Sequence, residues 1–475
     1  MTTADKYLDW DTALLGLIKV LESNNIILKK VCGNQDIIIL RDWRGRIHLG
    51  LPGDEEGFKS EALVKLLVRV NSLLGPLSAA STETSHAANE VGNQAQIVRN
   101  LVFFREALFD PSDFWDSPHL VKLESPSKLL ISLLDRQDKE NDWLRKATES
   151  DSDSIVPRAV FFGVKGGVGR SSALTALALH LAGQGKRVLV IDADFESPGV
   201  SSSLLDAKIR PDFGLVDWLT AHALGFDGLE ELAQKKVVET SPLSERAQGK
   251  ILIAPSHGIL TQTYVGKLGR MYRTTEDGMG FAERLRAVVS LLERLHQADV
   301  TLIDSRAGID DTAAAAITQL NARVSFLFAI NTQQTWDAYS LLFKHLKRHP
   351  SIHTEDDFRY RLRFVSALTP EEVGSTKGYW ANLREMAYST CAENLYDKDN
   401  ETSTEADESN HLTPVDYQLL NPAFDDEDVP HYPMRIMWDE VLRAFDPVQE
   451  PGQLAPTIIA KSFGDFLTRA TRLLG

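Results

Sequence analysis

The sequence predicts an α/β protein with a mostly parallel sheet flanked by helices, preceded by a smaller mixed α/β domain. Short apolar runs without polar alternation, such as Ala159–Val164 and Val188–Ile191, are typical of strands that are buried on both faces. Segments with apolar residues at helical spacing, such as Phe281–Leu295, separate these runs, and strands that alternate with helices form parallel sheets. Further strands are expected at Ile251–Ala254, Val300–Ile303, Val324–Ile330 and Leu362–Val365, with another helix at Trp336–Leu346.

Composition and charge disfavour several classes of protein. The 475 residues are 43% hydrophobic and 25% charged, as is typical of soluble globular chains. No window reaches the roughly 18 uninterrupted apolar residues of a membrane span. The two cysteines, Cys32 and Cys391, provide no disulfide framework, which fits a reducing cytoplasm. The net charge of −16 and the lack of a dense stripe of Lys and Arg argue against DNA as a partner. We therefore expect a cytoplasmic protein.

Residues 1–150 are predicted to form an accessory domain of mixed α/β structure. The runs Ile37–Leu40 and Ile47–Leu51 flank Trp43-Arg-Gly45 and indicate a hairpin with glycine at the turn. The acidic, serine-rich run Thr148–Ser154 contains no apolar residue and marks the boundary of this domain. Because the region contains no catalytic motif, we expect it to dock a partner protein or to support dimerisation. Helices are expected at Lys59–Leu74, Gln96–Leu108 and Leu129–Arg145, with a loose loop over Pro76–Gln94.

The second predicted domain spans residues 155–475. Residues 393–412 are rich in acidic and small polar residues, which indicates a flexible, solvated insertion. The final stretch, Ile458–Leu474, gathers its apolar residues on one helix face and intersperses three basic residues. Packing of this face against the sheet is the interpretation that we favour, and binding to a membrane surface is the alternative.

One segment of the second domain predicts a phosphate-binding loop. Gly163-Val-Lys-Gly-Gly-Val-Gly-Arg-Ser-Ser172 follows a predicted strand and precedes a predicted helix. Its glycines let the backbone turn N–H groups toward an anion, and the helix N-terminus adds further N–H groups and a favourable dipole. The hydroxyl of Ser171 is placed to ligate Mg²⁺, as in other P-loops, and that of Ser172 to bond the α-phosphate. The expected nucleotide contacts here are Gly166, Gly167, Val168, Gly169, Arg170, Ser171 and Ser172.

These residues resemble the ParA/MinD family of P-loop ATPases, whose pattern is Lys-Gly-Gly-x-Gly-Lys-Thr/Ser. The resemblance covers about residues 158–375 and implies that ATP and Mg²⁺ bind here. Lys165 matches the signature lysine, which in that family reaches across a nucleotide-sandwich dimer to the partner's phosphates. The resemblance therefore implies an ATP-dependent homodimer in which Lys165 is a catalytic residue.

Arg170 departs from the family pattern, which has a lysine at this position. Arginine keeps the charge and can bind phosphate through two hydrogen bonds, but it is bulkier and planar. We therefore expect ATP to bind, and Arg170 leaves the rate of hydrolysis open.

Three carboxylates stand where the family carries its remaining motifs. One apolar strand ends in Asp192 and Asp194, and carboxylates at the carboxyl end of a parallel strand face the ligand crevice. By the resemblance, Asp192 lies near Mg²⁺ through water, and Asp194 positions or activates the attacking water. A second apolar strand ends in Asp304 in the form of a Walker B motif, so Asp304 is expected to hold the water shell of Mg²⁺. Gly308, which follows it, is expected to present its N–H to the γ-phosphate.

Two functions are open on these observations. The first is a nucleotide-dependent dimerisation switch with slow ATPase activity, in which Asp194 and a bound water hydrolyse ATP. The second is a nucleotide sensor or scaffold with little or no hydrolysis, which docks a partner through the N-terminal domain. Arg170 is the feature that favours the second.

Overall fold

The computed structural model describes fourteen stretches of the chain, and it divides the chain into two compact units, Met1–Asp138 and Lys139–Gly475. The predicted boundary run at 148–154 lies outside the described residues, as do parts of the predicted turn at 43–45 and of the loop over 76–94. The domain limits predicted at residues 150 and 155 stay a prediction. The described residues are 10–42, 45–53, 60–80, 97–108, 112–115, 120–123, 125–135, 141–144, 156–272, 275, 279–354, 356–371, 378–398 and 419–475.

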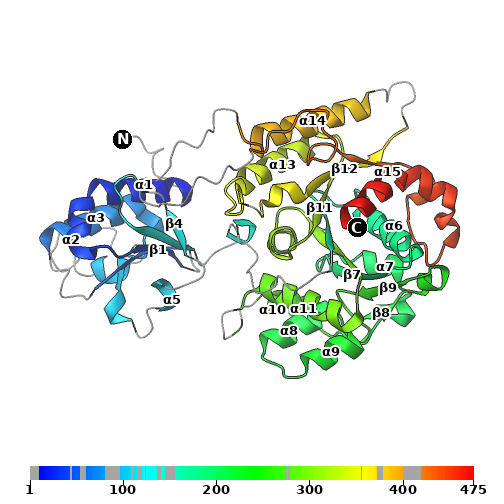
Figure 1. Ribbon diagram of the computed structural model, residues 1–475. Helices are drawn as coiled ribbons and strands as arrows, with labels where there is room; N and C mark the ends of the chain where they lie inside the picture. Colours follow the sequence, from blue (N-terminus) through cyan, green and yellow to red (C-terminus); the bar gives the residue numbers. More distant parts are fainter. Residues whose placement is uncertain are drawn as a thin grey trace. The chain divides into compact units, whose positions relative to one another are not determined.

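The first unit is built on a five-stranded mixed sheet (Figure 1). Its strands are β1 (Ile37–Arg41), β2 (Ile47–Leu51), β3 (Val102–Phe104), β4 (Val121–Leu123) and β5 (Ile131–Asp135), and its helices include α1 (Trp10–Ser23), α2 (Asn25–Cys32), α3 (Glu61–Leu74) and the short α5 (Ser112–Trp115). The strand order is β3-β2-β1-β5-β4. The predicted hairpin is confirmed by the antiparallel pair β1–β2, and the predicted helix over Lys59–Leu74 by α3. Apolar residues of α1, α2 and α3 are buried against one face of the sheet, and aromatic residues near α5 pack on the other.

Two helices predicted in this unit are wrong in whole or in part. Within the segment Leu129–Arg145, Ile131–Asp135 form strand β5, which pairs with β1 in parallel and with β4 antiparallel, and Asn141–Leu144 form a 3₁₀ helix. Residues 136–140 and 145 lie outside the described part of the chain. Ile131 belongs to one apolar cluster and Leu134 to the other, so both faces of this strand are buried. An apolar run of that kind cannot be told from a buried helix by its periodicity. Within Gln96–Leu108 the chain leaves the helix at Val102, where β-branched and aromatic residues form β3 beside β2.

The second unit contains an eight-stranded sheet, which confirms the predicted mostly parallel architecture. Its strands are β6 (Arg158–Gly163), β7 (Arg187–Ala193), β8 (Glu239–Thr240), β9 (Lys250–Ala254), β10 (Val300–Ala307), β11 (Val324–Ala329), β12 (Leu362–Thr369) and β13 (Met434–Met437). Their order is β13-β12-β11-β6-β10-β7-β9-β8, and only β8 runs antiparallel to its neighbour. The strand that leads into the phosphate loop, β6, is therefore central. The two edge strands were not predicted, because each is too short to show a pattern.

Helices cover both faces of this sheet (Figure 1). The described helices are α6 (Arg170–Gly183), α7 (Val200–Leu204), α8 (Leu215–Ala223), α9 (Leu229–Lys236), α10 (Tyr264–Met271), α11 (Phe281–His296), α12 (Asp311–Ala314), α13 (Gln333–Leu346), α14 (Tyr379–Asn394) and α15 (Pro456–Leu474). One apolar core joins the sheet to α6, α7 and α15, and the other joins it to α8, α9 and α11–α14. In the part of the chain that the structure describes, no helix has both the length and the apolar character needed to cross a membrane.

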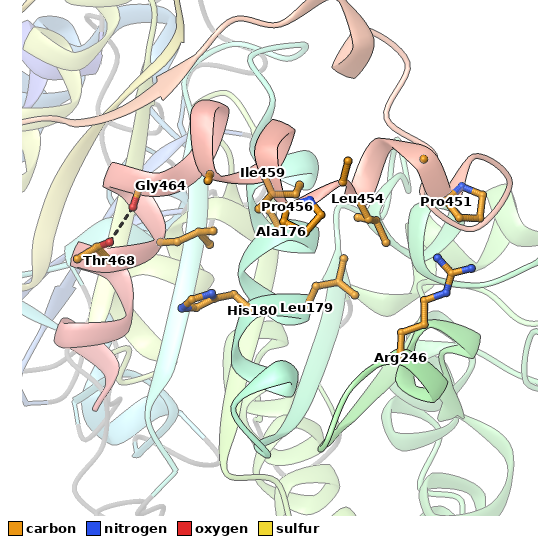
Figure 2. Close-up of a pocket in the computed structure, with 14 residues that line it drawn as sticks. Ala176, Leu179, His180, Arg246, Pro451, Leu454, Pro456, Ile459, Gly464 and Thr468 are labelled. Atoms are coloured by element: carbon orange, nitrogen blue, oxygen red, sulfur yellow. Dashed lines mark hydrogen bonds between the residues drawn. The ribbon is translucent and has the colours of Figure 1, made fainter.

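The apolar face of α15 packs on the sheet beside α6, as the favoured interpretation predicted. Phe466 lies within 6.4 Å, between ring centroids, of Phe161, Phe326 and Phe328. Farther along α6 from the phosphate loop, α6 and α15 border a groove of about 610 Å³ that is lined mainly by apolar side chains (Figure 2). Phe463, Phe466, Leu467 and Ala470 of this face are thus buried in the protein core, and Ile459 is partly buried beside the groove.

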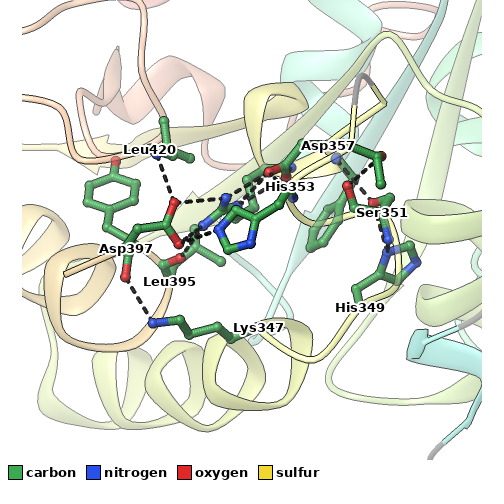
Figure 3. Close-up of polar contacts among 12 residues, drawn as sticks. Lys347, His349, Ser351, His353, Asp357, Leu395, Asp397 and Leu420 are labelled. Carbon is green, nitrogen blue, oxygen red and sulfur yellow. Dashed lines mark hydrogen bonds and ion pairs between the residues drawn. The ribbon is translucent and has the colours of Figure 1, made fainter. Parts of the chain in front are cut away.

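A buried ion-pair network lies beside the start of β12 (Figure 3). The guanidinium of Arg359 pairs with Asp357 (2.7 Å) and Asp397 (2.9 Å), and His353 Nε2 lies 3.0 Å from Asp397. Asp397 falls within the insertion that we predicted at 393–412. The described part of that segment, 393–398, ends α14 and includes the buried side chains of Tyr396 and Asp397, so the prediction of a solvated segment is wrong there. The remainder lies outside the described residues.

Candidate functional site

The phosphate loop connects the buried strand β6 to helix α6. Gly167 and Gly169 have φ angles of 73° and 81°, in the left-handed region that favours glycine. Gly169 is the N-cap of α6, so the first turn of this helix follows the loop directly. The N–H groups of a first helical turn have no partner within the helix and face an incoming anion. The predicted contacts from Gly166 to Ser172 therefore lie together on one loop and one helical turn.

The three residues predicted for the metal meet beside this loop. Because β7 and β10 are neighbours in the sheet, their register sets Asp192 opposite Asp304. The hydroxyl of Ser171 donates to Asp304 Oδ2 at 2.6 Å. Asp192 Oδ2 accepts from the backbone N–H and the hydroxyl of Ser201, at 3.2 and 2.5 Å. The other carboxylate oxygens, Asp192 Oδ1 and Asp304 Oδ1, are buried and have no hydrogen-bond partner among the described residues.

Burial raises the pKa of both carboxyl groups. Burial, followed by the negative charge of Asp304, raises the pKa of Asp192 to about 7. Burial likewise raises the pKa of Asp304 to about 6, although the charge of Arg170 and the hydrogen bond from Ser171 oppose it. Two buried carboxyl groups with unpartnered oxygens form a site that a cation would stabilise in its ionised form.

The raised pKa of Asp192 has a testable consequence for stability. An unfolded Asp loses its proton near pH 4, so between about pH 4 and 7 the folded protein binds more protons than the unfolded one. Without metal, stability should therefore fall across this window, by on the order of 4 kcal/mol for Asp192 alone. Asp192→Asn is expected to raise the melting temperature at pH 8 and to change it little at pH 5. Thermal melts in EDTA measure this, with the exposed Asp227→Asn as control; an equal shift at both pH values would contradict the prediction.

Arg170, at the position of the usual phosphate-loop lysine, is directed into the protein. It is only 7% exposed. Its Nη1 donates to the carbonyl oxygen of Ser305, and its Nη2 donates to Asp194 Oδ2 at 3.2 Å. Asp194 Oδ1 accepts from the backbone N–H and the hydroxyl of Ser197, at 3.3 and 3.0 Å. Two predicted site residues of opposite charge are therefore paired with each other.

Lys165 and Gly308 lie on the loops at the same edge of the sheet. Lys165 is half-buried, and its Nζ lies 3.5 Å from Thr332 Oγ1. Gly308 has a φ of 97°, and its N–H donates to the carbonyl oxygen of Gly163 at 3.0 Å. In this conformation the N–H that we expected to face a γ-phosphate bonds to the phosphate loop itself, so contact with a phosphate requires this bond to break.

Sequence analysis did not single out Glu196 and Tyr272, which link the loop after β7 to the end of β10 and to the end of α10. Glu196 accepts a hydrogen bond from the Tyr272 hydroxyl at 2.9 Å and pairs with Arg306 at 3.0 Å. Arg306 also pairs with Asp310 at 3.1 Å. Tyr272 lies 76 residues from Glu196 in the chain, and no motif marks either residue. Only the order of the strands brings them together.

One family model and several solved structures are similar to this chain. A family model described as the CobQ/CobB/MinD/ParA nucleotide binding domain matches residues 159–352. The structure of pNOB8 ParA is 17% identical with a TM-score of 0.41, and the match covers 67% of this chain and 99% of that chain. A ParA family ATPase from Chlorobium tepidum TLS is 15% identical with a TM-score of 0.37, covering 66% and 98%. Cobyrinic acid a,c-diamide synthase from Mycobacterium smegmatis, with bound ADP and magnesium, is 16% identical with a TM-score of 0.36, covering 49% and 82%. No curated protein matches the chain in sequence.

Proposed function

Residues 159–352 belong to the CobQ/CobB/MinD/ParA family of nucleotide-binding domains, and from this premise we propose that the chain binds ATP and Mg²⁺ and dimerises according to its nucleotide state. The observation that carries the proposal is the cluster of Ser171, Asp192 and Asp304 beside the glycine-rich turn. The anion-binding backbone and the cation-binding oxygens lie at one place, as a nucleotide with its metal requires.

The side chains of the cluster suit Mg²⁺. This ion prefers oxygen ligands, keeps several of its waters and is held by one or two carboxylates together with substrate phosphates. Asp192 Oδ1 and Asp304 Oδ1 are buried without a partner among the described residues, and the hydroxyl of Ser171 already contacts Asp304. In this proposal these three residues hold the ion and its waters. Bound Mg²⁺ would neutralise part of the negative charge of the phosphates.

Dimerisation is proposed to depend on Lys165 and on apolar side chains at the same edge of the sheet. The loops that follow β9 and β10 carry Ile259, Leu260 and Ile309, which are each about half exposed, and Val265 at the start of α10 is 82% exposed. Contact with a second copy at this edge would remove these apolar side chains from water, which is favourable. A second copy of the chain would cover them, and the phosphates of the ATP bound to that copy would come within reach of Lys165.

Hydrolysis is proposed to depend on Asp194. Water forms a bond to the γ-phosphorus while the bond from this atom to the bridging oxygen breaks, and the proton of the water passes to the carboxylate. ADP and inorganic phosphate are the products. The pairing of Asp194 with Arg170 favours a slow reaction.

The second candidate is a nucleotide sensor or scaffold that hydrolyses little or no ATP. It is favoured by the same ion pair and by the first unit, where Leu15 on α1 is 60% exposed and Ile26 on α2 is 71% exposed. Such side chains suit a partner protein that docks on the N-terminal domain. Phosphate release by the wild type separates the two candidates, because the sensor predicts none above that of Asp194→Ala.

Nucleotide binding is tested by placing a side chain in the phosphate loop. Gly169→Ala forces an L-residue into the left-handed region at a φ of 81°, which costs roughly 1–2 kcal/mol or moves the loop. We expect this variant to bind Mg-ATP about tenfold more weakly in calorimetric titrations. Gly183→Ala is the matched control, because Gly183 ends the same helix without positive φ and with open space around a new Cβ. Equal affinity for ATP in the two variants, or no binding by the wild type, would overturn the proposal.

A further inference from the structure

The ion pair between Arg170 and Asp194 suggests how this site is regulated. The pair is buried, with side-chain exposures of 8% and 5%, and Arg170 also donates to Ser305 O. A planar guanidinium binds two acceptors at fixed angles, which a lysine ammonium does not. The arginine therefore fastens the first turn of α6 to the ends of both β7 and β10.

Asp194 is held from its other side as well. Its Oδ2 accepts from Arg170, and its Oδ1 accepts twice from Ser197. Both oxygens are thus engaged by the protein, and the residue is 4% exposed. The next acidic residue, Glu196, is held by Tyr272 and Arg306. The contacts of Asp194 occupy three of the about four acceptor positions of an ionised carboxylate and fix its orientation, so an attacking water competes for the position that Oδ2 retains beside Arg170.

We propose that Arg170 is a positioning residue that restrains Asp194, so that the arginine limits the rate of ATP hydrolysis without preventing ATP from binding. The inference rests on the proposed function, in which Asp194 accepts the proton of the attacking water. Separating a buried ion pair leaves uncompensated charges and is unfavourable, and an anion that takes the place of the carboxylate beside the arginine offsets part of this cost. The phosphates of a bound nucleotide are anions that can take this place. In the proposal, Arg170 moves from Asp194 to a phosphate of bound ATP, which frees Asp194 to orient the attacking water. The fraction of ATP-bound molecules in which Arg170 has moved then sets the rate of hydrolysis.

The first experiment replaces Arg170 by lysine in the full chain and measures hydrolysis at saturating Mg-ATP. We expect Arg170→Lys to raise kcat about tenfold, which corresponds to about 1.4 kcal/mol, with KM changed by less than about threefold. Arg158→Lys is the matched control, because Arg158 also forms a buried ion pair, with Glu293 at 2.7 Å, at the other end of β6. We expect no rise in kcat in this control. The double variant Arg170→Lys, Asp194→Asn should release no more phosphate than Asp194→Asn alone.

The second experiment measures the exchange without hydrolysis. In Asp194→Asn, Arg170 forms no ion pair at this position, so ATP does not have to break one when it binds. We therefore expect this variant to bind ATP about tenfold more tightly than the wild type does. We also expect its release of phosphate to stop. A role of Asp194 in hydrolysis alone predicts unchanged affinity. This variant keeps the test decisive where Arg170→Lys is unstable in thermal melts.

The outcomes separate this inference from the proposed function. If the wild type binds ATP, but Arg170→Lys is no faster and Asp194→Asn binds no more tightly, Arg170 does not restrain Asp194 and the inference is overturned alone. If the wild type does not bind ATP, the proposed function fails instead.

Discussion

Asp304→Asn is expected to abolish the dependence of ATP binding on magnesium. Asp304 Oδ2 accepts from Ser171, and its Oδ1 is buried with no partner among the described residues. Asparagine keeps the shape and an acceptor oxygen but removes the charge that a divalent ion needs. Loss of a single residue that orients the shell of a metal costs at least about tenfold in metal affinity. In calorimetric titrations, the wild type should bind ATP more tightly with MgCl₂ than with EDTA, and the variant should show one affinity in both.

Asp299→Asn is the matched control for this substitution. Asp299 is an exposed aspartate that directly precedes β10, the strand that carries Asp304. Its variant is expected to keep the magnesium dependence of the wild type. If Asp304→Asn still binds ATP more tightly with MgCl₂ than with EDTA, Asp304 is not a residue of the metal site. Ser171 and Asp192 would then be the remaining residues proposed to hold Mg²⁺.

Lys165→Ala is expected to eliminate the ATP-dependent dimer. The ammonium of Lys165 lies 3.5 Å from Thr332 Oγ1, a contact at the outer limit of a hydrogen bond, so little holds it in place. In the proposed dimer it pairs with phosphates of the second copy. Truncation of one partner of a buried interfacial charge pair costs about 2–5 kcal/mol, which weakens association more than tenfold. Light scattering coupled to size-exclusion chromatography, with Mg-ATP and without nucleotide, measures the effect.

The matched control is Lys186→Ala, which removes an exposed lysine from the turn that precedes β7. It should dimerise with ATP as the wild type does. If Lys165→Ala also forms the dimer at the same concentration of ATP, Lys165 is not the residue that joins the two copies. A wild type that is equally dimeric with and without ATP would instead contradict the nucleotide switch.

The two units differ in how well their elements could be predicted. In the second unit the apolar runs at β6, β7, β9, β10, β11 and β12 were all expected, because parallel strands buried on both faces leave an unbroken apolar pattern. In the first unit, β5 has the same pattern but was predicted as a helix. The two predictions differ because of the residues that follow each run. A glycine-rich loop follows β6 and identifies that run as a strand, whereas no such motif follows Ile131–Asp135 in the sequence.

Some features of the candidate site could be predicted from the sequence and others could not. Local sequence was enough for the glycine-rich turn and for the acidic residues at strand ends, because both depend on neighbours in the chain. It was not enough for the partners of those acids. Asp192 is held by Ser201 and Asp194 by Arg170, and neither pair follows from a spacing rule.

The sequence by itself determined that this protein has a phosphate loop, three carboxylates at the ends of two buried strands and an arginine where its relatives have a lysine. Backbone conformation and strand burial are encoded locally, so these features could be predicted. The tertiary structure decided what the arginine contacts. Because α6 begins beside the ends of both β7 and β10, Arg170 reaches Asp194, 24 residues away in the chain, and Ser305, 135 residues away. The order of the strands determines such contacts between residues that are distant in the chain. The proposal that Arg170 restrains Asp194 therefore depends on the tertiary structure.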